Sequence, residues 1–246
     1  MKTRKVYFQD LGKNQDYEEV WKYQEDLMNE IIAIKSENFA KSKAGETNLK
    51  PTLNHLLFVE HPHVYTLGKS GDISNLKANQ DFLNQIQASF VKTNRGGDIT
   101  YHGPEQLVGY PILDLENFKP DIHLYMRNLE EVIIRVVSDF GLKAERSKGE
   151  TGVWLDVGKP YARKICAMGV KASRWVTIHG FALNVNTDLR YFEYIIPCGI
   201  KDKAVTSLER ELNRTIDIDE VKSSVQKHFE NVFEATLEFE TKTFNL

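Results

Sequence analysis

The segment RGGDITYHGPEQLVGYPILDL, residues 95–115, joins a glycine-rich run to a strand pattern that follows it directly. Three glycines precede Glu105, and glycine lets a backbone come close to a ligand, although the same residues also suit an ordinary turn. From Gln106 to Leu113 the chain is rich in β-branched and aromatic residues, which indicates a strand. The segment therefore predicts a sheet strand that is entered through a loop able to hold a ligand.

Similar strand patterns occur on both sides of this segment, at His55–Glu60, Phe90–Thr93, Gly152–Val157, Lys164–Val170, Thr177–Asn184 and Thr236–Glu240. Apolar residues at three- and four-residue spacing predict helices at Tyr17–Ile34, Leu124–Phe140 and Asp217–Phe233, each packing its stripe into a core. There is no regular βαβ repeat. We therefore expect an α+β domain whose mixed or largely antiparallel sheet carries helices on one side.

The composition is that of a soluble globular protein with 41% hydrophobic and 27% charged residues. No linker divides the 246 residues, so we expect one domain over residues 1–246, with a surface loop in the polar stretch 36–54. A net charge of −3 argues against nucleic-acid or membrane-surface binding. The chain has two cysteines and no signal-peptide or membrane-span pattern, which predicts a cytoplasmic protein without disulfides.

Cys198 is the candidate nucleophile. Pro197 and Gly199 restrict and free the backbone on its two sides, which is how a chain presents a side chain at a sharp bend. A thiol reacts as its thiolate and needs a cationic or basic neighbour, for which Lys164 is the candidate. Spacing alone would pair Lys164 with Cys166, because residues two apart share one face of a strand. A buried, inert cysteine is the ordinary alternative for either thiol.

Five ordered segments resemble the octanoyltransferases of lipoate biosynthesis. They are RGGDITYHGPEQLVGYPILDL, RKICAMGVK (163–171), HGFALNVNTDL (179–189), PCGI (197–200) and TSL (206–208). The resemblance implies a biotin/lipoate-protein ligase-like fold, related to class II synthetase cores, with a mixed sheet and flanking helices. It also implies that Cys198 and Lys164 are catalytic, and that Cys166, where the family has a small residue, belongs to the core. The implied substrate-binding residues are Arg95, Gly96, Gly97, Asp98, Ile99, Thr100, Tyr101, His102, Ala167, Met168, Gly169, Gly180, Phe181 and Ala182. Glu105 departs from the glycine that the family commonly has.

The resemblance implies transfer of octanoyl from octanoyl-acyl carrier protein to a lysine of a lipoyl domain, through a thioester on Cys198. The implied acceptors are the lipoyl domains of 2-oxoacid dehydrogenase complexes and the glycine cleavage H protein. Because a thioester donor is already activated, we expect no cofactor, ATP or metal. Acyl carrier protein is acidic, and four basic residues flank the expected site and are candidates for its docking patch: Lys159, Arg163, Lys171 and Arg174.

Two other functions remain open from the residues. A lipoate or biotin ligase on the same fold would activate a free acid with ATP, release pyrophosphate and not depend on Cys198. A noncatalytic protein that binds lipoyl domains or acyl carriers would have no need of the Cys198 and Lys164 pair.

Overall fold

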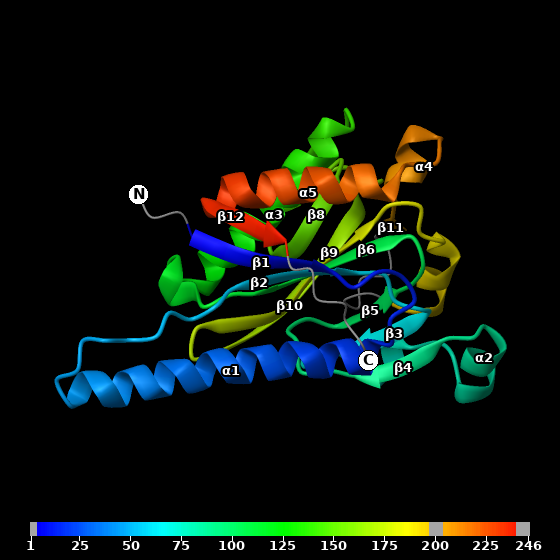
Figure 1. The fold of residues 1–246 in the computed structure, drawn as a ribbon. Coiled ribbons are helices and arrows are strands. Elements are labelled where there is room, and N and C mark those ends of the chain that lie inside the picture. The colour runs from blue at the N-terminus through cyan, green and yellow to red at the C-terminus, as the bar shows by residue number, and fades with distance from the viewer. Residues whose placement is uncertain (1–3, 197–203, 240–246) are drawn as a thin grey trace.

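A mixed β-sheet forms the centre of the computed structural model, which describes residues 4–196 and 204–239 (Figure 1). The strand order in the described part is β12-β1-β2-β6-β10-β9-β8-β7, and β11 pairs with β9. The pairs of β1 with β2 and β12, and of β11 with β9, are parallel, whereas the others are antiparallel. The strands are β1 (Arg4–Asp10), β2 (His55–Val59), β6 (Gln106–Ile112), β7 (Ala144–Ser147), β8 (Glu150–Leu155), β9 (Arg163–Ser173), β10 (Val176–Asn184), β11 (Ala204–Val205) and β12 (Ala235–Phe239).

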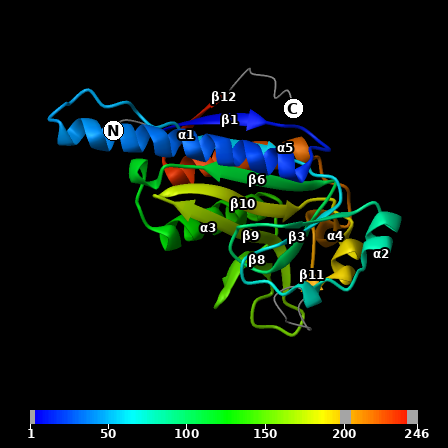
Figure 2. The ribbon, with the colours of Figure 1, turned by 90° about the horizontal axis from the view of Figure 1, so that it is seen from below.

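Helices cover both faces of this sheet. On one face α3 (Ile122–Asp139) and α5 (Ile218–Phe233) pack together, and their apolar stripes join the largest core cluster. The long helix α1 (Tyr17–Lys43) lies on the opposite face and is nearest the viewer from below (Figure 2). The expectation of helices on one side is therefore wrong. Every residue of β2, β6 and β10 is buried, because these central strands are covered from both sides.

Helix α1 continues beyond the predicted end near Ile34, so residues 36–43 are helical and the expected loop is confined to the remainder of 36–54. The apolar stripe ends early because this part of the helix projects past the sheet (Figure 1). Local pairs support it instead: Glu37 and Lys41 form an i,i+4 ion pair at 2.9 Å, and the Asn38 side chain bonds the backbone of Lys50. An apolar periodicity in the sequence cannot predict the end of a helix that packs no apolar side chains into the core.

A second, three-stranded sheet stands beside the first, in the order β4 (Ser89–Lys92), β3 (Val64–Leu67) and β5 (Ile99–His102). Strands β3 and β5 are antiparallel, with Thr66 opposite Thr100. An aromatic and aliphatic cluster packs against this sheet and includes residues of the 3₁₀ helix Leu189–Tyr194. The small sheet holds the end of the glycine-rich segment beside the main sheet.

The remaining elements are short and escaped the sequence patterns. They are α2 (Gln80–Gln85), α4 (Leu208–Leu212) and the 3₁₀ helices Ile73–Asn75 and Leu115–Asn117. The predicted helices 124–140 and 217–233 agree with α3 and α5 to within two residues at each end. In the described ranges, no helix combines the length and the apolar character needed to cross a bilayer.

Glu105 adopts the left-handed conformation that glycine would adopt without strain, with φ +60°. Its side chain is held on two sides, because Oε2 accepts a hydrogen bond from Asn186 at 2.9 Å and Oε1 accepts one from Lys13 at 3.2 Å. Its backbone N–H donates to Glu60 at 2.9 Å. These local hydrogen bonds therefore hold the left-handed conformation at Glu105 and offset its backbone strain.

Candidate active site

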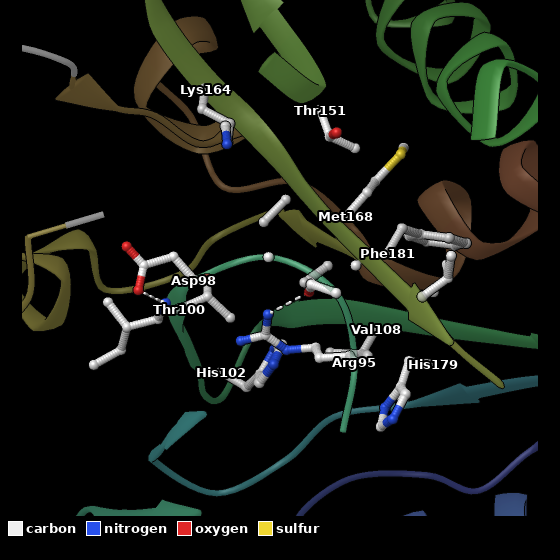
Figure 3. A pocket seen from close by; sticks show the side chains of 18 of the residues that line it. Arg95, Asp98, Thr100, His102, Val108, Thr151, Lys164, Met168, His179 and Phe181 are labelled. Carbon is white, nitrogen blue, oxygen red and sulfur yellow. Dashed lines mark hydrogen bonds between the residues drawn. The ribbon is translucent and has the colours of Figure 1, made fainter. Parts of the chain in front are cut away.

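A cavity of about 560 Å³ lies where β9 and β10 meet the glycine-rich segment (Figure 3). Lys164 lines it, together with all but one of the residues expected to bind substrate: Arg95, Gly96, Gly97, Asp98, Ile99, Thr100, His102, Ala167, Met168, Gly169, Gly180, Phe181 and Ala182. These residues come from the glycine-rich segment and from the consecutive strands β9 and β10, which lie far from it in sequence. The fold therefore brings three of the family-like segments around one space.

Tyr101 does not line this cavity. Its neighbours in β5, Thr100 and His102, face the cavity, and alternation along the strand turns Tyr101 to the other side. There its hydroxyl lies 2.7 Å from His63 Nδ1, and its ring stacks on Tyr191 at 5.0 Å. Tyr101 therefore packs within the small sheet, and its contact with substrate stays a prediction that the shape of the cavity does not support.

The loop of Arg95, Gly96 and Gly97 contacts β9 through its backbone. Gly96 N donates to Val170 O at 2.9 Å, and a Cβ on Gly169 would lie 2.7 Å from Gly96 O. Arg95 is buried, and its Nη2 donates to the carbonyl of Thr66 at 2.7 Å and to the hydroxyl at 2.8 Å. Because Gly96 and Gly169 have no side chains, the backbones of the loop and of β9 can pack closely together. Arg95 anchors the loop to β3.

Lys164 reaches the cavity because β9 contains a β-bulge. The register against β8 shifts between Val153 and Trp154, which pair with Cys166 and Lys164 respectively. The extra residue, Ile165, breaks the alternation, and both Ile165 and Cys166 are buried in the core beneath α3 and α5. Lys164 therefore points away from Cys166, although the two are separated by only one residue. Figure 3 shows Lys164 and Met168 leaving β9 on different sides.

The Lys164 ammonium lies 4.6 Å from the centre of the Trp154 ring, a cation–π contact that favours the charged amine. On the other edge of β9, Val205 pairs with Lys164, and Thr206 N donates to Lys164 O at 2.9 Å. Cys198 lies outside the described residues. The described chain stops at Ile196, whose N–H donates to Asn75 O at 2.8 Å, and resumes at Ala204 in the cavity wall.

Cys166 has the properties of a core residue. Its side chain is fully buried, and this burial raises the pKa of the thiol far above its usual value. A buried thiol with a high pKa is unreactive. The structure therefore supports the assignment of Cys166 to the core, and it removes the residue that spacing alone would have paired with Lys164.

Two buried histidines near the site are neutral in the folded protein. Burial lowers the pKa of His61 to about 4, and burial, with the charges of Arg95 and Lys171, lowers that of His179 to about 3. His61 contacts Gln15 O at 2.7 Å and Tyr110 Oη at 2.8 Å, and His179 Nε2 lies 2.9 Å from Asn94 Oδ1. Both side chains are thus fitted to the uncharged imidazole.

These histidines predict a loss of stability at mildly acidic pH. Below about pH 6.5 they bind protons in the unfolded chain but not in the folded protein, so the free energy of unfolding falls as the pH drops toward 4. Each should contribute about 1.4 kcal/mol per pH unit in that window. Urea unfolding at pH 7, 6 and 5 measures the slope, and His61→Gln should reduce it. A stability that stays constant from pH 7 to 5 would contradict the buried, neutral state.

Three residues in or beside the cavity were not predicted from the sequence. Trp154 lines the cavity beside Lys164, and only the bulge in β9 makes them neighbours. Thr66 anchors Arg95 from a strand that sequence patterns missed. Asn184 also lines the cavity, and it stands within the family-like segment HGFALNVNTDL, which could have singled it out.

The four basic residues expected to dock an acyl carrier do not form one patch. Arg163 and Lys171 are eight residues apart in β9, or roughly 26 Å at the usual rise of an extended strand. Arg163 forms ion pairs with Asp156 and Glu211, and Lys159 pairs with the same aspartate. Near the other end of β9, Lys171 lies 3.5 Å from Glu25, and Arg174 donates to the Ser36 hydroxyl. These cations are divided between two places, and carboxylates neutralise three of them.

Known proteins share this fold. A bi-partite lipoate protein ligase from Thermoplasma acidophilum superposes with a TM-score of 0.65 at 16% identity, over 98% of this chain and 89% of that chain. The model of the lipoyl protein ligase A/B catalytic domain matches residues 16–230. The fold is therefore that of a lipoate-ligase-like catalytic domain, as the sequence predicted.

Proteins named octanoyltransferase match along almost the whole chain. The one from Flavobacterium johnsoniae is 60% identical over 96% of this chain and 99% of its own length. The one from Christiangramia forsetii is 58% identical over 97% of this chain and 100% of its own length. The chain belongs to the lipoyl protein ligase A/B family and, within it, to the octanoyltransferases, which are acyltransferases.

Proposed function

We propose that this octanoyltransferase moves octanoyl from octanoyl-acyl carrier protein to a lysine of lipoyl domains through a thioester on Cys198. The acceptors would be the lipoyl domains of 2-oxoacid dehydrogenase complexes and the glycine cleavage H protein. The two cysteines without a disulfide motif favour the reducing cytoplasm as the place of the reaction.

One observation carries the proposal: the chain on both sides of the Cys198 segment is hydrogen-bonded to elements that form the wall of the cavity that Lys164 enters. On one side Ile196 bonds Asn75, whose side chain donates to Asp98 of the cavity wall at 2.8 Å. On the other side Ala204 and Val205 line the cavity and pair with β9 at Arg163 and Lys164. These flanks support a pairing of the Cys198 thiolate with the Lys164 ammonium.

In the first step the Cys198 thiolate attacks the carbonyl carbon of the donor thioester. A new C–S bond forms, the old one breaks, and the carrier thiolate takes a proton from the Lys164 ammonium. In the second step the amine of the acceptor lysine attacks the Cys198 thioester. The C–N bond forms, the C–S bond breaks, and Lys164 recovers a proton from the amine. The balance is one carrier thiol and one octanoyl amide for each thioester and amine consumed.

No ATP is required in this scheme, because the energy of the donor thioester drives both steps. A metal is likewise unnecessary, since proton transfer at Lys164 and attack by a thiolate supply the chemistry. Transfer should therefore continue in the presence of EDTA and without nucleotide. Pyrophosphate release from ATP and free octanoate would instead support an adenylating ligase.

Intact mass spectrometry after mixing with octanoyl-acyl carrier protein, without ATP, tests the covalent step. We expect the mass of one octanoyl group on the wild type and on Cys166→Ser, and none on Cys198→Ser, because a serine hydroxyl lacks the nucleophilicity of a thiolate. The Cys166→Ser variant is the matched control, since it removes the other thiol. An adduct on Cys198→Ser, or transfer that needs ATP, would overturn the proposal.

A further inference from the structure

A chain of buried hydrogen bonds runs beneath the cavity, and two main-chain carbonyls fix its direction. Asn184 Nδ2 donates to Thr206 O at 2.9 Å, which turns Asn184 Oδ1 toward Gln106. Gln106 Nε2 donates to that oxygen at 2.9 Å and to Tyr101 O at 3.2 Å. Carbonyl oxygens only accept, so neither amide can be turned around without losing these bonds.

The orientation of Gln106 then determines the tautomer of His102. Gln106 Oε1 lies 2.9 Å from His102 Nδ1, so Nδ1 carries the hydrogen and donates it. His102 Nε2 is left as an acceptor for the Thr66 hydroxyl at 3.4 Å, and that hydroxyl accepts from Arg95 Nη2 at 2.8 Å. Each residue from Arg95 to Asn184 therefore donates a hydrogen bond to the next member of the series, and Thr206 O is the last acceptor.

The surroundings of His102 keep it uncharged. Burial lowers its pKa well below the usual value, and the neighbouring His61, Arg95 and His179 lower it further. Helix α1 contributes the neutral ring of Tyr17, which stacks on His102 at 5.7 Å. A neutral imidazole can donate at one nitrogen and accept at the other, as this chain requires.

The last member of this series of hydrogen bonds, Thr206, contacts the backbone of Lys164. Thr206 gives its carbonyl to Asn184 and its N–H to Lys164 O at 2.9 Å. We propose that Gln106, Asn184 and the Nδ1–H tautomer of His102 are positioning residues that tie the Arg95 loop to the strand segment carrying Lys164. This inference rests on the catalytic role proposed for Lys164. A buried network whose hydrogen bonds all run in one direction restrains its members, so it holds the two walls of the cavity in one arrangement.

NMR of protein with ¹⁵N-labelled histidine tests the chain without any substrate. We expect the His102 signals of a neutral Nδ1–H imidazole from pH 6 to 8 in the wild type. Gln106→Leu removes the acceptor of Nδ1–H and should move His102 toward the Nε2–H tautomer. An Nε2–H or charged His102 in the wild type would overturn the proposed direction of the chain.

Octanoyl transfer by Gln106→Leu tests the positioning role. Gln106 is buried and is not among the cavity-lining residues, so an effect on turnover must act through other residues. We expect kcat to fall about tenfold while KM for the octanoyl donor changes less than about twofold. Gln9→Leu is the matched control, a buried glutamine of β1 that accepts from the Tyr23 hydroxyl at 3.1 Å. It should lose comparable thermal stability and keep its kcat.

The outcomes separate the two proposals. Wild-type kcat in Gln106→Leu, or an equal loss in Gln9→Leu, would overturn the positioning role and leave the acyl transfer intact. A wild-type protein that transfers no octanoyl would overturn the proposed function instead. The His102 tautomer measured by NMR would then still test the direction of the hydrogen bonds.

Discussion

Lys164→Met is expected to lower octanoyl transfer about a thousandfold. Methionine nearly matches the length of the aliphatic stem but has no charge and no proton to exchange. In the proposed mechanism it therefore removes both the ion-pair partner of the Cys198 thiolate and the acid that protonates the leaving carrier thiolate. The initial rate of transfer from octanoyl-acyl carrier protein measures the loss, and iodoacetamide alkylation of Cys198 against pH measures the thiolate. In Lys164→Met, alkylation of Cys198 should require a higher pH than in the wild type, nearer the ordinary thiol pKa of about 8.5.

Lys164→Arg separates charge from proton exchange. Arginine keeps a cation but does not lose its proton in proteins, so alkylation should stay closer to the wild-type profile while transfer stays strongly reduced. Lys222→Met is the control, since this lysine of α5 is largely buried and paired with Asp10 at 2.8 Å, and it is not among the cavity-lining residues. It should lose stability and keep activity. Transfer by Lys164→Met within tenfold of the wild type would contradict the role proposed for Lys164.

About half of the residues that line the cavity could be predicted from the sequence, because three segments of the chain resemble a family with one pocket. The exception among the residues predicted for the cavity wall is Tyr101, whose side chain lies in the middle of β5 on the face that packs against the aromatic residues of the small sheet. The helices with apolar stripes were predictable because burial leaves a period in the sequence. The projecting end of α1 buries no stripe and therefore left no such signal.

The placement of Lys164 could not be derived from spacing. Simple alternation puts Lys164 and Cys166 on one face, and the β-bulge opposite Val153 and Trp154 separates them. A bulge depends on the pairing of β9 with β8, which no local pattern of β9 reveals. The family resemblance placed Cys166 in the core, where the structure has it, for a reason unrelated to geometry, and the catalytic role of Lys164 stays a prediction. The same limit applies to the helices on both faces, since sequence periods show which stripe is buried but not against which face of the sheet.

Gly180→Ala is expected to destabilise the fold by about 3 to 5 kcal/mol. The sequence assigned Gly180 to the substrate pocket, and it does line the cavity, but the structure gives it a second constraint. A Cβ at this position would lie 2.1 Å from Gly109 O and 2.7 Å from Pro111 Cδ, both in β6. One methyl group would thus have to push apart the two central strands of the sheet. Urea unfolding of wild type and variant measures the cost.

Gly141→Ala provides the control, because this glycine follows α3 with φ +79° and a Cβ there would meet nothing within 4 Å. It should cost only about 1 kcal/mol, from the left-handed backbone alone. Gly180 has no such backbone strain, so the excess in Gly180→Ala would measure the close contact between β10 and β6. Equal costs in the two variants would mean that the sheet can accommodate the methyl group. Gly180 would then be required only by the cavity and whatever occupies it.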